Sequence, residues 1–96
     1  MKVFKSDGRY KLHNRGYTYI AEFRWKNRDD DAAYSTIGRG LESMHGPQWL
    51  DMPGKSILGA RRMRNENYVL EVNKNAKRRR IYVKNESDIT MALLKG

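Results

Sequence analysis

Residues 17–26, Tyr-Thr-Tyr-Ile-Ala-Glu-Phe-Arg-Trp-Lys, decide the fold class of this 96-residue chain. Aromatic and small apolar residues occupy alternate positions of this stretch, polar residues occupy most of the others, and Ile20 is the one exception. A period of two with β-favouring residue types is typical of a strand that buries one face. We therefore predict a strand over 17–26. The residues on its buried face are Tyr17, Tyr19, Ala21, Phe23 and Trp25.

A helix is expected directly after this strand. Asn27 or Asp29 can cap its first turn, and successive aspartates there place negative charge at the positive end of the helix dipole. Gly46 is a natural end. Gly38 and Gly40 indicate either close packing on the sheet or an earlier end of the helix. The residues that recur at helical spacing and form its apolar stripe are Ala33, Ile37, Leu41 and Met44.

The N-terminal and C-terminal thirds predict further strands. A turn at Asp7-Gly8 is followed by alternating residues over 9–13, which predict a strand, and then by a turn at 14–16. Residues 68–72 and 79–84 predict two strands joined by a turn. The stretch 57–63 fits a strand or a helix, and 89–94 fits a final strand or a short helix, of which its period-two pattern favours the strand.

Residues 47–56 predict a loop, in which Pro53-Gly54 suits a type II turn. We expect Trp49, Leu50 and Met52 to close one edge of the core. The fold class is then α+β, with an antiparallel sheet of about five to six strands and one principal helix packed on one face. The whole chain, 1–96, is predicted to be a single small basic domain, because two shorter domains would each bury too small a core.

Composition narrows the class of protein. The chain has no cysteine, which excludes disulfides, thiolate zinc sites and thiol catalysis and favours a reducing cytoplasm. It has no apolar run near the about 20 residues that a membrane-spanning helix needs, so we expect no membrane role. Its start has no apolar stretch of signal-peptide length, so we expect the mature protein to be the whole chain.

The charge is large and segregated. Twenty Lys and Arg against eleven Asp and Glu give a net charge of +9. Residues 1–28 carry +6, residues 29–54 carry −4 and residues 55–96 carry +7. A surface built only for solubility would intersperse the signs. This pattern predicts an anionic partner, with nucleic acid first, an acidic protein second and an anionic lipid third.

Motifs for catalysis and cofactors are incomplete. Gly54-Lys55-Ser56 lacks the glycine that a phosphate loop needs at position 49, and Gly38-Arg39-Gly40 lacks the third glycine of a dinucleotide fingerprint. The aspartates at 29–31 are better explained by the helix dipole than by a magnesium site. We therefore predict a protein that is not an enzyme and has no catalytic residue, cofactor or metal site.

Clustered arginines between residues 61 and 84 are the best functional signal. The planar guanidinium binds phosphate in a bidentate manner and stacks on bases. A strand over 79–84 places Tyr82 on one face between Arg80 and Lys84, where its ring could stack on a base, as could Tyr68. The alternatives are that Tyr82 faces the core and that the cations protect a sheet edge. The predicted nucleic-acid-binding residues are Arg61, Arg62, Arg64, Lys77, Arg78, Arg79, Arg80, Tyr82 and Lys84.

A second basic face is also predicted, with Arg9, Lys11 and His13 beside Arg24 and Lys26. The chain is expected to bind RNA or single-stranded DNA, because no helix is basic enough to read a major groove. In size, basicity and lack of cysteine it resembles many short phage-encoded proteins that bind host factors or nucleic acid. The alternatives are an interaction module or inhibitor that docks on a host protein with an acidic surface, and a homodimer formed through open strands.

Overall fold

The computed structural model describes residues 1–52 and 61–95, except for the side chains at 50–52 and 61–63. In chain order the elements are β1 (Lys2–Lys5), the 3₁₀ helix η1 (Lys11–Arg15), β2 (Tyr19–Phe23), α1 (Arg28–His45), β3 (Trp49–Met52), β4 (Arg61–Arg64), β5 (Tyr68–Asn73), β6 (Arg78–Val83) and α2 (Ser87–Lys95).

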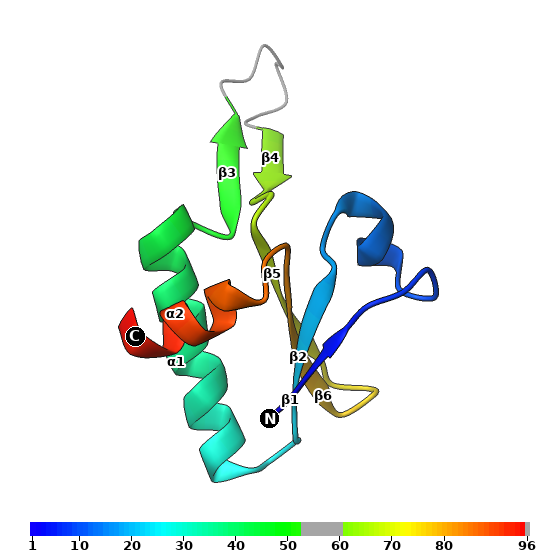
Figure 1. Cartoon of the computed structure of the whole chain (residues 1–96), viewed down its shortest axis with the longest axis vertical. Helices are drawn as coiled ribbons and strands as arrows, with labels where there is room; N and C mark the ends of the chain where they lie inside the picture. The colour runs from blue at the N-terminus through cyan, green and yellow to red at the C-terminus, as the bar shows by residue number, and fades with distance from the viewer. Residues whose placement is uncertain (53–60, 96) are drawn as a thin grey trace.

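The described strands form one four-stranded sheet and one separate ribbon. The sheet has the order β1-β2-β6-β5, and every neighbouring pair in it is antiparallel. Strands β3 and β4 form a two-stranded antiparallel ribbon that stands beyond one end of the sheet (Figure 1). The α+β class is confirmed. The prediction of five to six strands in one sheet with one principal helix matches only roughly, because the described strands divide into two sheets and two helices are present.

The strand predicted over 17–26 is present but shorter. Ala21 and Phe23 of β2 pack toward the helices, in the larger core cluster. Ile20 is also fully buried, on the opposite face, where it packs with Tyr82. Tyr17 belongs to this second cluster too, so its predicted place on the face of Ala21 and Phe23 is wrong. Ile20 interrupts the polar face in sequence because this part of the sheet is covered on both sides.

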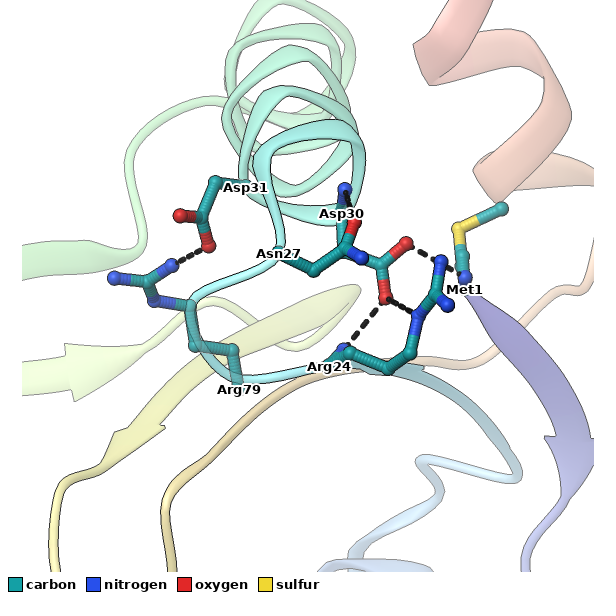
Figure 2. A network of polar contacts seen from close by, with 6 residues as sticks. All are labelled: Met1, Arg24, Asn27, Asp30, Asp31 and Arg79. Carbon is teal, nitrogen blue, oxygen red and sulfur yellow. Dashed lines mark hydrogen bonds and ion pairs between the residues drawn. The ribbon is translucent and has the colours of Figure 1, made fainter.

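The main helix is α1, and its predicted ends are confirmed. The Asn27 side chain accepts a hydrogen bond from the amide of Asp30 at 3.0 Å, and Gly46 forms the C-cap. The Asp30 carboxylate, 3 % exposed, accepts from the Met1 ammonium at 2.8 Å and from the Arg24 amide at 2.6 Å (Figure 2). These bonds tie the start of α1 to the ends of β1 and β2.

Gly40 of α1 permits close packing, but against helix α2 and not against the sheet as predicted. A Cβ on Gly40 would lie 2.2 Å from the carbonyl oxygen of Ala92 in α2, so the two helices meet here without a side chain between them. A Cβ on Gly38 would lie 3.5 Å from the Leu70 side chain, an ordinary contact distance.

The strand favoured over 89–94 is wrong and the short-helix alternative is correct, because α2 covers this stretch. Ile89 and Ala92, three positions apart, are buried against the main core. Met91 and Leu93, which a strand would have placed beside Ile89, are exposed. The period of two was accidental, and the buried positions follow the helical spacing.

The strand predicted over 9–13 is also wrong. The Tyr10 amide donates to the carbonyl of Asp7 at 3.1 Å and the His13 amide to that of Tyr10 at 3.1 Å, so the chain winds into turns and then into η1. Gly16 ends η1 in the left-handed conformation, with φ of 96°, as the predicted turn requires. Residues 6–16 lie on the face of the sheet opposite the helices (Figure 1).

The ribbon corrects two further predictions. Residues 49–52 form β3 where a loop was predicted, and 61–64 form β4 within the ambiguous stretch. Trp49 does not close the core, since it is 42 % exposed. The base of the ribbon is fixed by buried Asn65, whose side-chain amide donates to the carbonyls of His45 and Pro47 at 2.8 and 3.1 Å.

The strands over 68–72 and 79–84 are confirmed as β5 and β6, with the turn between them. The predicted turn at Pro53-Gly54, the phosphate-loop motif and residues 57–60 lie outside the described residues. Among the residues that are described, neither helix combines the length and the apolar composition that crossing a membrane requires.

Candidate functional site

A basic cavity of about 690 Å³ opens on the face of the sheet opposite the helices. Six cationic side chains and one carboxylate line it, together with apolar and aromatic groups from the same face. The lining residues are Arg9, Tyr10, Lys11, Leu12, Arg15, Arg64, Glu71, Arg78, Arg80 and Tyr82. Cations from the N-terminal third and from the C-terminal half therefore meet here, although the sequence separates them by about half of the chain.

The alternation of β6 divides its three successive arginines between the two faces of the sheet. Arg78 and Arg80 point into the cavity together with Tyr82, as the strand pattern predicts. Arg79 lies on the helix side, where it pairs with Asp31 at the start of α1 (Figure 2). Arg79 also stacks over Trp25, 5.1 Å from the ring centroid. The predicted arginine cluster is therefore not a single surface.

Arg80 is the most enclosed cation of the cavity. Its register partners are Glu22 on β2 and Glu71 on β5, and its guanidinium lies 2.8 Å from the Glu22 carboxylate. The guanidinium also lies over the Tyr10 ring, 5.4 Å from the centroid. With 13 % of its side chain exposed, Arg80 is held in one position and forms part of the cavity wall.

The other cations of the cavity differ in how far they are neutralised. Arg78 is 3.4 Å from Glu71, and Arg9 is 2.9 Å from Asp7, whose carboxyl pKa is lowered mainly by the hydrogen bond from Arg9. Among the described side chains, no carboxylate forms an ion pair with Lys11, Arg15 or Arg64. Among the described side chains, these three carry the positive charge of the cavity that no carboxylate neutralises, and an anion can bind them without breaking an ion pair seen in that part of the chain.

The two tyrosines predicted to stack on bases are buried. Tyr82 is 4 % exposed and Tyr68 is 1 % exposed. Burial raises the pKa of the Tyr82 hydroxyl, an effect that its hydrogen bond with Arg80 partly offsets, so the group stays neutral near pH 7. Tyr82 packs beneath Tyr10 and Leu12, and its ring offers little surface to a base.

The remaining predicted residues lie elsewhere or are not described. Lys77 is exposed in the β5–β6 turn, with φ of 51°. Lys84 follows β6, and its side chain lies about 3.3 Å from where a Cβ of Gly16 would stand. The side chains of Arg61 and Arg62 are outside the description. In the second predicted face, Arg24 turns away from Arg9 and Lys11 and pairs with Asp30.

Two contributors were missed because local pattern could not reveal them. Arg15 was assigned to a turn, and Tyr10 to the apolar side of a strand that does not form. Both reach the cavity because η1 folds over the sheet, and Tyr17, just after it, donates its hydroxyl to the Asn65 carbonyl at 2.6 Å. The sequence feature that could have indicated this arrangement is the high density of Lys and Arg on both sides of η1.

The histidines are held in polar pairs. His13 Nδ1 is 2.8 Å from the hydroxyl of Ser6, which also donates to the Tyr17 carbonyl at 3.0 Å. His45 Nε2 is 3.0 Å from Asp88, so this pair joins the end of α1 to the start of α2. Both arrangements hold segments together, and neither histidine lines the basic cavity.

The fold and the cavity define an α+β protein with a basic, partly aromatic hollow on the sheet face opposite its helices. No protein-family model, curated protein or solved structure matches the chain.

Proposed function

We propose that this protein is a non-catalytic nucleic-acid-binding protein that holds the phosphate backbone of RNA or single-stranded DNA in the basic cavity. The observation that carries the proposal is the convergence of six cations on one hollow, three of them without a carboxylate partner among the described side chains. Phosphate contacts by Lys and Arg supply most of the affinity in sequence-independent binding.

The cavity favours a flexible polyanion. Arg9, Lys11 and Arg15 approach from η1 and the turn before it, and Arg64 approaches from the ribbon. Phosphates of a single strand can adjust their spacing to such a curved set of cations, whereas a duplex presents a stiff, regular backbone. Because the Arg80 guanidinium is fixed between two glutamates, it shapes the wall of the cavity and adds little positive charge that is not already neutralised.

Filter binding across a range of salt concentrations tests the proposal. With four to six phosphate contacts, we expect the logarithm of the association constant to fall against the logarithm of salt with a slope of roughly −3 to −5. Absence of RNA and single-stranded DNA retention near about 50 mM salt, where such contacts are strongest, would overturn it.

A matched pair of double variants locates the surface. Lys11→Gln with Arg15→Gln removes two cavity charges, and Arg39→Gln with Lys95→Gln removes two exposed helix charges. We expect the first pair to weaken binding more than tenfold and to reduce the slope by about 1 to 2, and the second pair to change neither appreciably. Equal effects would show that net charge alone drives binding.

An interaction module for an acidic protein is the second candidate. Arginine and tyrosine, which line the cavity, are also the preferred anchors of protein interfaces. Capture of one acidic protein in stoichiometric amount, unchanged by nuclease treatment and lost in Lys11→Gln with Arg15→Gln, would favour this function over the first.

A further inference from the structure

We propose that Trp49 is a base-stacking residue beside the basic cavity, and that the ligand is therefore single-stranded. This inference rests on the proposed function and extends it from phosphate contacts to the bases. It starts from a large aromatic side chain that the fold leaves 42 % exposed, whereas Phe23 and Tyr68 are buried in the core.

Trp49 is joined to the cavity through one side chain. Arg64 faces it across the β3–β4 ribbon, and the Arg64 guanidinium lies over the indole, 5.2 Å from the ring centroid. The same Arg64 lines the basic cavity. A strand whose phosphate binds Arg64 thus has its adjoining base within reach of the indole, and a base stacked there is also next to a guanidinium.

The pair is held in place from the body of the protein. Gln48, which precedes Trp49, accepts from the amide of Asn65 at 2.8 Å and donates its side-chain amide to the Leu70 carbonyl at 3.2 Å. Asn65 follows Arg64 and is 2 % exposed. These bonds anchor the residues that flank Trp49 and Arg64 before any ligand arrives, which lowers the ordering cost of binding.

The geometry discriminates between nucleic-acid forms. In a duplex the faces of the bases are stacked on one another, and an indole can reach them only by unstacking. A single strand offers every base face freely, and cation-lined grooves beside exposed aromatic rings are the usual way to bind it. An Arg64–Trp49 pair that served only to stabilise the ribbon would make no such distinction.

The two tryptophans of the chain provide the experiment. Trp25 lies on the helix side beneath Arg79, and Trp49 lies beside the cavity. In Trp25→Phe the fluorescence reports Trp49 alone, and in Trp49→Phe it reports Trp25 alone. The probe is an oligothymidylate of about 12 nucleotides, within the range of single-strand site sizes, compared with a DNA duplex of the same length.

We expect the oligothymidylate to quench Trp49 emission in Trp25→Phe, to leave Trp25 emission in Trp49→Phe nearly unchanged, and to bind at least about tenfold more tightly than the duplex. Trp49→Ala should weaken oligothymidylate binding about tenfold and bring it close to the duplex value. Circular dichroism of each variant confirms that the fold is retained.

Two outcomes overturn the inference separately from the proposed function. One outcome is binding that shows the expected salt slope but leaves Trp49 emission unchanged, with equal affinities for Trp49→Ala and the wild type. It would exclude Trp49 as a stacking residue and leave the basic cavity as the proposed binding site. Quenching by an acidic protein but by no oligonucleotide would overturn both and favour the protein-interaction function.

Discussion

Arg80 and Glu22 face each other on neighbouring antiparallel strands, and the guanidinium lies 2.8 Å from the carboxylate. The Arg80 side chain is 13 % exposed, so the pair is partly shielded from solvent. It links β6 to β2 and also withholds one positive charge from the basic cavity. Stability and anion affinity are therefore opposed at this position.

Glu22→Gln should shift that balance. Removal of the carboxylate charge frees Arg80 for phosphate, so nucleic-acid affinity should rise and the salt slope should become more negative by about 0.7. The free energy of unfolding should fall by about 1–2 kcal/mol, because a charged hydrogen bond is weakened. Filter binding and urea unfolding measure the two effects.

Asp31→Asn is the control for this prediction. It removes the same charge from a carboxylate that pairs with Arg79 on the helix side of the sheet. Its net charge equals that of Glu22→Gln, but the salt slope should stay at the wild-type value. A change of equal size in both variants would mean that binding follows net charge and not the cavity.

The parts of the fold that the sequence predicts are those with a local physical cause. The Asn27 cap and the Gly46 end define α1, and alternation defines β2, β5 and β6. The segments that were misassigned, η1, β3 and α2, are short, and tertiary packing decides their conformation. For α2 the deciding fact is its approach to Gly40, which no local pattern contains.

The candidate site was only half predictable for a related reason. Strand alternation correctly places Arg80 and Tyr82 on one face, and it also implies that Arg79 lies on the other. Which carboxylates pair with these arginines depends on strand order, because Glu22 and Asp31 come from distant segments. The joining of Arg15 to Arg64 in one cavity likewise requires the three-dimensional fold.

Asp30→Asn tests the network at the start of α1. The hydrogen bond from the Met1 ammonium, and to a smaller extent those from Arg24, hold the pKa of the Asp30 carboxyl well below its usual range. The folded state then favours the charged form, so this stabilisation is present above pH about 4 and is lost as the pH falls further. We expect the variant to unfold at lower urea than the wild type at pH 7.

The pH dependence is the critical readout for Asp30. The difference between the wild type and Asp30→Asn should narrow as the pH falls below about 4, because the wild-type carboxyl then takes up a proton on unfolding. Urea unfolding followed by circular dichroism at several pH values measures it. A difference that stays constant down to pH about 2 would show that the charge of Asp30 does not contribute.

Gly40→Ala and Gly38→Ala should have opposite effects, although both replace a glycine in α1. A Cβ at Gly40 overlaps the backbone of Ala92, and we expect the free energy of unfolding to fall by about 2–3 kcal/mol. A Cβ at Gly38 meets the Leu70 side chain at 3.5 Å, so the gain in helix propensity should stabilise the protein by about 1 kcal/mol. Destabilisation by both would show that α1 tolerates an added methyl group neither toward Leu70 nor toward α2.

Tyr68→Phe should remove a pH dependence of the free energy of unfolding at alkaline pH. Tyr68 is 1 % exposed, its hydroxyl donates to the Gly46 carbonyl at 2.7 Å, and burial raises its pKa to about 12. In the unfolded chain a tyrosine ionises near pH about 10, so between these values unfolding releases a proton. Stability should therefore fall with rising pH, by about 1.4 kcal/mol per pH unit from this group.

At pH 7 Tyr68→Phe should lower the free energy of unfolding by about 1–2 kcal/mol because the hydrogen bond is lost, and the difference from the wild type should shrink between pH about 10 and 12. Parallel stability curves for the two proteins across that range, measured by urea unfolding, would contradict the assignment.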